Sequence, residues 1–165
     1  MGAGSSKILF VNPANCDGCK ECETACSAKH DGVGEPDAMR IQILSSDGHN
    51  GFYLPMTCQQ CEKPPCMSVC PKEAIYRDKE LGCVMIDRHL CVGCRMCASA
   101  CPTGVMGYDE ERGIAFKCDL CGGSPECVRV CDPRALYHTE SQRFLYARIN
   151  DSATKLRGAV HESAN

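Results

Sequence analysis

Cysteine spacing is the feature that most constrains this chain. Seventeen of the 165 residues are cysteine, and all but Cys83 fall into four blocks of four. The blocks are Cys16, Cys19, Cys22 and Cys26; Cys58, Cys61, Cys66 and Cys70; Cys91, Cys94, Cys97 and Cys101; and Cys118, Cys121, Cys127 and Cys131. Any fold of this chain must therefore satisfy sixteen clustered thiols.

The third block matches a known cluster-binding pattern residue for residue. It reads CVGCRMCASACP, the C-x2-C-x2-C-x3-C-P run in which three cysteines bind one iron–sulfur cluster and the fourth binds a neighbouring cluster. The second block, CQQCEKPPCMSVCP, and the fourth, CDLCGGSPECVRVCDP, have a longer gap before the third cysteine, and Asp132 precedes the proline of the fourth. The first, CDGCKECETACS, keeps the spacing but lacks the proline. We therefore predict that the sixteen cysteines are iron ligands.

Two other uses of clustered cysteines fit the pattern less well. Disulfides are typical of small secreted domains at this cysteine density, but the count is odd and the spacing is regular. A zinc site needs two C-x2-C pairs and requires neither a third nearby cysteine nor a following proline. A structural zinc protein remains the distant alternative.

Composition agrees with a fold organised by metal. Aromatic residues make up 5% of the chain and tryptophan is absent, so an ordinary apolar core would be thin, and cluster binding would supply folding energy. The net charge of -3 lacks the basic footprint of a nucleic-acid partner. No apolar run is long enough for a direct membrane span, and the N-terminus does not resemble a signal peptide. We expect a cytoplasmic protein.

Short apolar stretches flank the blocks and predict strands. They precede the blocks at residues 8–11, 52–54, 83–86 and 114–116, and PKEAIY, PTGVMGY and DPRALYH follow blocks two to four. The unit of strand, cluster loop, short helix and strand thus recurs four times. In the longer interval 27–51, the apolar stretch 39–44 indicates a hairpin or a segment that contacts a partner.

The spacing between blocks predicts an α+β fold of two interleaved bacterial-ferredoxin-like halves, each of βαβ type, within a domain at 7–146. Blocks two and three have 20 residues between them and a proline after each fourth cysteine, so they form an inner unit at about 52–109. Blocks one and four diverge from the pattern and form an outer unit from 7–51 and 110–146. Residues 147–165 are a polar tail that is flexible or docks on a partner.

Taken in order, the four blocks resemble those of the four-cluster electron-transfer subunits of the dimethyl sulfoxide reductase iron–sulfur subunit type. Similar subunits serve formate dehydrogenases, hydrogenases, carbon monoxide dehydrogenases and tungsten aldehyde oxidoreductases. The resemblance covers about residues 7–146 and implies four [4Fe-4S] clusters with ligands exchanged between blocks. The implied ligand sets are Cys58, Cys61, Cys66 and Cys101; Cys91, Cys94, Cys97 and Cys70; Cys16, Cys19, Cys22 and Cys131; and Cys118, Cys121, Cys127 and Cys26.

The function that follows is electron transfer without catalysis. The chain has no nucleotide-binding glycine motif, P-loop or nucleophile motif, so it is not expected to be an enzyme by itself. The expected partner is a large catalytic oxidoreductase subunit that holds a tungsten or molybdenum cofactor, such as aldehyde oxidoreductase, with a flavin- or nicotinamide-linked acceptor subunit. Self-association could extend the electron path. The alternatives are a freestanding polyferredoxin and a subunit of a carbon monoxide dehydrogenase, hydrogenase or formate dehydrogenase.

Other residues receive simpler interpretations. Cys83 is predicted to be a buried small hydrophobe, and the loop cations to be solvated charges. Apolar residues between ligands are expected to shield the clusters from water. The histidines show no ligand spacing and are predicted to lie at the surface or in turns. These loop cations are Lys20, Lys63, Arg95 and Arg129; the apolar residues are Val69, Val92, Met96, Val128 and Val130; the histidines are His30, His49, His89, His138 and His161.

Overall fold

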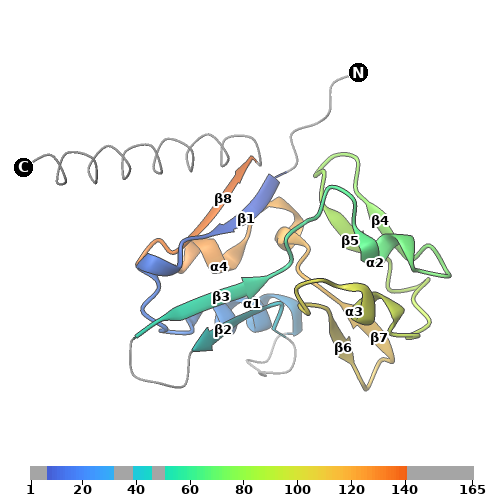
Figure 1. The fold of residues 1–165 in the computed structure, drawn as a ribbon, viewed down its shortest axis with the longest axis horizontal. Coiled ribbons are helices and arrows are strands. Elements are labelled where there is room, and N and C mark those ends of the chain that lie inside the picture. Colours follow the sequence, from blue (N-terminus) through green and yellow to red (C-terminus); the bar gives the residue numbers. More distant parts are fainter. Residues whose placement is uncertain (1–6, 32–38, 46–50, 141–165) are drawn as a thin grey trace, which may run out of the picture.

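The computed structural model describes residues 7–31, 39–45 and 51–140. Within these ranges, short strands form four separate two-stranded antiparallel sheets, with short helices between them (Figure 1). The strands are β1 (Lys7–Val11), β2 (Ile41–Ser45), β3 (Tyr53–Thr57), β4 (Ile75–Arg77), β5 (Val84–Ile86), β6 (Gly107–Asp109), β7 (Ile114–Phe116) and β8 (Leu136–Glu140). The α-helices are α1 (Glu21–Asp31), α2 (Pro65–Ser68), α3 (Met96–Ala100) and α4 (Glu126–Arg129), and 3-10 turns η1 and η3 span Pro13–Asn15 and Leu120–Gly123.

One of the four sheets joins segments from distant parts of the chain. Strand β1 pairs with β8, from Lys7 opposite Glu140 to Val11 opposite Leu136, so the first and last described strands lie side by side (Figure 1). Strands β2 and β3 pair next to each other, which places the apolar stretch predicted at 39–44 in a strand pair. The other two sheets are the local pairs β4–β5 and β6–β7.

The predicted strands before the blocks correspond to β1, β5 and β7, and the prediction at 52–54 overlaps the start of β3, which extends to Thr57. The apolar segments after blocks two to four form β4, β6 and β8. Mixed short helices and strands of this kind are consistent with a ferredoxin-like α+β domain. The polar tail at 147–165 lies outside the described residues.

Proline explains why the helices inside the blocks differ in length. Pro71 and Pro102 follow Cys70 and Cys101, and a proline disfavours helical geometry at the residue before it, so α2 and α3 end before those cysteines. Ser27 follows Cys26 in the first block, and α1 continues through it to Asp31 over 11 residues. The missing proline of the first block therefore has a direct structural consequence.

Two apolar clusters form the interior, and cysteines make up much of both. One contains Leu9, Ile41, Leu120 and Leu136 together with Cys22, Cys26, Cys83, Cys118 and Cys127. The other contains Ile75, Val84 and Ala115 together with Cys66 and Cys97. Cys83 is fully buried, as predicted. Among the described residues, no helix is both long and apolar enough to cross a membrane.

Candidate metal centres

Three cavities are each lined by four cysteines that come from two different blocks. Every one contains three cysteines of one block and the last cysteine of another. The cysteines are Cys58, Cys61, Cys66 and Cys101 in the first cavity, Cys70, Cys91, Cys94 and Cys97 in the second, and Cys16, Cys19, Cys22 and Cys131 in the third. The chain thus brings together thiols that are far apart in sequence.

The remaining block cysteines gather at a fourth place. Helix α1, which carries Cys26, packs against α4, which carries Cys127. Burial, and then the proximity of Cys118, Cys26 and Cys121, raises the pKa of Cys127. We call these four residues the central outer group and the cysteines of the first cavity the central inner group. The cysteines of the second and third cavities are the inner end group and the outer end group.

The four groups adjoin one another in a definite order. Cys22 of the outer end group is near enough to Cys127 to influence its ionisation. Cys58 of the central inner group acts in the same way on Cys118 of the central outer group. Helices α2 and α3, which pack together, connect the two inner groups through Cys66 and Cys97. The order is outer end, central outer, central inner, inner end.

Burial keeps several of these thiols in their neutral form. It raises the pKa of Cys22 to about 12 and that of Cys118 to about 11. The pKa values of Cys66 and Cys97 are also raised, first by burial. At Cys101 burial acts in the same direction, but hydrogen bonds from the Thr103 hydroxyl and nearby amides outweigh it and lower the pKa. A metal bound by these cysteines would therefore displace protons from their thiols.

The donor set fits an iron–sulfur cluster. Each group offers four soft thiolate donors, and soft sulfur ligands favour iron–sulfur clusters and zinc. Backbone amides also donate to sulfurs of the block cysteines: Arg40 N to Cys26 Sγ at 3.4 Å, Ala115 N to Cys91 Sγ at 3.5 Å, and Ala135 N to Cys131 Sγ at 3.2 Å. Such hydrogen bonds raise the potential of a bound cluster.

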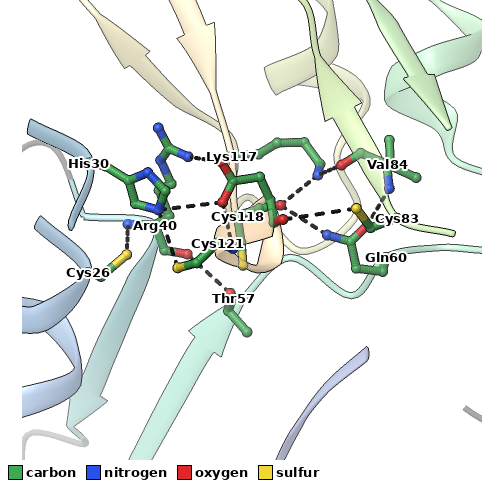
Figure 2. Close-up of polar contacts among 11 residues, drawn as sticks. Cys26, His30, Arg40, Thr57, Gln60, Cys83, Val84, Lys117, Cys118 and Cys121 are labelled. Atoms are coloured by element: carbon green, nitrogen blue, oxygen red, sulfur yellow. Dashed lines mark hydrogen bonds and ion pairs between the residues drawn. The ribbon is translucent and has the colours of Figure 1, made fainter. Parts of the chain in front are cut away.

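A charged network borders the central outer group (Figure 2). Asp119 accepts a hydrogen bond from Arg40 Nη1 at 2.7 Å and another from Cys121 N at 2.9 Å. His30 Nε2 lies 3.4 Å from Asp119 Oδ1 and 3.6 Å from Cys121 Sγ. Burial would raise the pKa of Asp119, but Arg40 and then His30 outweigh it and hold that pKa below its usual value.

The position of His30 corrects the prediction that the histidines lie at the surface or in turns. Its side chain is only 11% exposed and stands beside a cysteine of the fourth block. His138 is half-buried on β8, where burial lowers its pKa. His89 is exposed as predicted, and His49 and His161 lie outside the described residues.

Two polar residues between the central groups were not found from the sequence. Gln60 donates from Nε2 to the carbonyl oxygen of Cys118 at 3.0 Å and accepts from Val84 N at 2.7 Å. Lys117 Nζ donates to the same Cys118 oxygen at 2.7 Å and to the Val84 carbonyl (Figure 2). The sequence feature that could have indicated them is their position, because each residue directly precedes a cysteine of a block.

The other loop predictions have mixed outcomes. Lys20, Lys63, Arg95 and Arg129 are exposed, as expected for solvated charges. Val92 and Met96, by contrast, are 58% and 49% exposed. Val92 nevertheless lines the cavity of the inner end group, so the shielding of a cluster by these residues stays a prediction. Val92 lies in the loop before α3, and Met96 is the first residue of that helix.

These cysteine groups, with short helices and short antiparallel strands between them, define an iron–sulfur protein of the ferredoxin type. Residues 49–141 match the family model of the 4Fe-4S dicluster domain, and the chain belongs to this family. It is 37% identical over 123 residues to the polyferredoxin-like subunit of aliphatic sulfonate oxidoreductase from Pyrococcus furiosus, covering 74% of this chain and 70% of that protein. It is 38% identical over 145 residues to the B subunit of the anaerobic dimethyl sulfoxide reductase of Escherichia coli, covering 78% and 70%.

A further relative is longer than this chain. Subunit beta of the NADH-dependent phenylglyoxylate dehydrogenase of Aromatoleum evansii is 37% identical over 153 residues, which are 92% of this chain but 34% of that protein. The relatives confirm the resemblance to ferredoxin-type electron-transfer subunits of oxidoreductases.

Proposed function

We propose that this chain is a non-catalytic subunit that relays single electrons through four [4Fe-4S] clusters, between a catalytic subunit and an acceptor. The observation that carries the proposal is the gathering of sixteen thiols into four groups of four, three of which line separate cavities. Groups that adjoin in one order form a path along which electrons can move by short steps.

Each group is proposed as the ligand set of one cluster. The cavity linings support three sets, and the mutual influence of Cys26, Cys118, Cys121 and Cys127 supports the fourth. The exchange of the last cysteine between blocks favours two interleaved units, at about 52–109 and at 7–51 with 110–146, inside a domain at 7–146. The pairs β2–β3 and β6–β7 span the two junctions between these units.

The chain's own residues would hold the clusters, order them and set their potentials. A bound [4Fe-4S] cluster supplies one-electron exchange. The cysteines would fix the position of the cluster from two directions. Buried side chains such as Ile75 and Leu136 limit the access of water to it. The backbone amides of Ala115 and Ala135 donate hydrogen bonds to the sulfurs of proposed ligands. Cys19 and Cys94, one in each end group, are exposed, so the ends of the path are where electrons would enter and leave.

We infer that the catalytic partner is a tungsten- or molybdenum-cofactor oxidoreductase, with aldehyde oxidoreductase as the specific candidate. Relatives named as subunits of a sulfonate oxidoreductase and of a dimethyl sulfoxide reductase support an oxidoreductase partner. The relative in an NADH-dependent dehydrogenase supports a nicotinamide-linked acceptor. The proposed location is the cytoplasm, where thiolates stay reduced.

Anaerobic purification tests this function directly. The protein should contain about sixteen iron and sixteen sulfide per chain, four of each per cubane, and should show paramagnetic clusters on stepwise reduction. Zinc in place of iron would overturn the proposal. Purification from the native host under the same conditions tests the partner: a co-purifying tungsten or molybdenum enzyme is expected, and a stable monomer that reduces several carriers would instead indicate a freestanding polyferredoxin.

A further inference from the structure

Lys117 is a buried cation between two of the cysteine groups. It follows β7, directly precedes Cys118, and is only 4% exposed. Its side chain lines the cavity of the central inner group, while its Nζ hydrogen bonds to the carbonyl of Cys118, which belongs to the central outer group. The residue therefore borders both groups at the same time.

No carboxylate compensates this charge within the part of the chain that the structure describes. The partners of Nζ there are the carbonyl oxygens of Val84 and Cys118, and Asp119 pairs instead with Arg40. A buried cation without a counter-charge is costly, and buried charges are normally paired with an opposite charge. A cubane with four thiolate ligands is a net anion, so two such clusters would supply the missing negative charge.

Cysteines of both groups lie beside Lys117. Cys66, of the central inner group, lines the same cavity as Lys117. Cys118, of the central outer group, directly follows Lys117 in the chain and accepts a hydrogen bond from its Nζ through the carbonyl oxygen. One ammonium group therefore lies next to proposed ligands of both groups.

We propose that Lys117 is a positioning residue shared by the two central clusters, where its charge stabilises the reduced form of both and raises their reduction potentials. The inference rests on the proposed function. Reduction adds one electron to a cluster and makes it more negative, while no bond of the chain forms or breaks. A fixed positive charge between two neighbouring clusters favours the added electron on either one. The reduction potentials of the two central clusters therefore stay close, and electrons can pass between them.

Gln60 provides a matched control within the same contact. It bridges the same two residues, Val84 and Cys118, but is neutral. Substituting Gln60 therefore removes the bridge without removing charge. Lys79, which is exposed in the turn between β4 and β5, serves as a control for a change in net charge alone.

The experiment is a redox titration of the reconstituted full-length protein, followed by electron paramagnetic resonance, with iron counted in each sample. In Lys117→Met and Lys117→Gln, the equilibrium constant for reduction should fall about tenfold at two of the four clusters, which is about 59 mV for a one-electron couple. Lys117→Arg should keep it within about threefold, as should Gln60→Met and Lys79→Met. Unchanged potentials in both neutral variants, or an equal fall in Gln60→Met, would overturn the proposal.

Loss of clusters is also informative. If the neutral variants lose iron while Lys117→Arg keeps it, the charge is needed to hold the two central clusters, which supports the proposal. If Lys117→Arg loses iron as well, shape rather than charge is decisive and the proposal fails. Absence of iron from the unaltered protein would instead overturn the proposed function, so the two failures are distinguishable.

Discussion

Individual cysteines have two roles in this molecule, because six of the fourteen buried residues in the apolar clusters are proposed ligands. Cys22, Cys26, Cys118 and Cys127 pack with Leu9 and Ile41 in the same cluster that contains Cys83. The four block cysteines and Cys83 therefore share an environment but differ in the proposed role. That difference can be measured.

Replacing Cys83 and Cys118 by alanine should have opposite effects on iron content. Cys83 is fully buried, and its sulfur makes one long contact, 3.9 Å from the carbonyl oxygen of Asp119. Cys83→Ala should keep all the iron and lose about 1 to 2 kcal/mol of stability from the cavity. Cys118→Ala should lose a cluster, about four iron atoms per chain. Iron analysis checks both, and iron loss in Cys83→Ala would show that it is a ligand.

Gly93, in the third block, should tolerate no side chain. Its φ is +67°, and a Cβ would collide with the carbonyl oxygen of Gly113. Gly104 has the same φ of +67° but open space around it. Gly104→Ala should therefore cost about 1 to 2 kcal/mol from left-handed backbone strain alone, while Gly93→Ala should cost more and release iron. Thermal bleaching of cluster absorbance measures both, and equal bleaching temperatures would contradict the collision.

At the scale of elements, the ion pair between Arg40 and Asp119 connects the residue before β2 to the residue before the 3-10 turn η3. The Arg40 side chain is 4% exposed and that of Asp119 is 25% exposed. The pKa of Asp119 is lower in the folded protein than in the unfolded chain, where it is about 4. The stabilisation from the ionised carboxylate is therefore complete at pH values above the unfolded pKa, and it is lost as the pH falls through the folded pKa. At neutral pH the pair is fully formed.

Arg40→Met should remove this ion pair and lower the free energy of unfolding. Removing one partner of a largely buried pair leaves the other uncompensated, and we expect a loss on the order of 2 to 3 kcal/mol at neutral pH, with preferential release of iron from the central outer group. Arg129→Met is the matched control, because Arg129 pairs with Glu126 but is 73% exposed, so its loss should stay below about 1 kcal/mol. Denaturant unfolding under anaerobic conditions compares the two; similar losses would count against this view.

The sequence predicted local elements better than long-range contacts. Apolar stretches before the blocks located β1, β5 and β7 because strand propensity and turn residues act locally. The contact of His30 with Cys121 spans 91 positions and that of Gln60 with Cys118 spans 58, and no local pattern encodes either. Lys117 was missed for a related reason: residue type predicts an exposed lysine, and only the assembled cysteine groups make its burial reasonable.

Over the whole molecule, the central groups are more enclosed than the two ends. The central outer group contains three buried cysteines, whereas each end group has one exposed cysteine, Cys19 or Cys94. Val92 and Met96 beside the inner end group are also exposed. An electron relay needs this arrangement of buried central groups and exposed end groups. Enclosed clusters have reduction potentials that solvent does not perturb, and exposed clusters can exchange electrons at the surface.

Iron removal should unfold the chain as a whole. Without clusters, the four two-stranded sheets and two apolar clusters rich in thiols leave little else to oppose chain entropy, and isolated two-stranded pairs are marginal in water. Treatment with an iron chelator and a mild oxidant, followed by reduction of any disulfides, should abolish the cooperative thermal transition. Circular dichroism and hydrogen exchange provide the measurement. An apo chain that keeps protected amides in β1 and β8, whose pairing joins the two ends of the described chain, would show that the fold does not depend on metal.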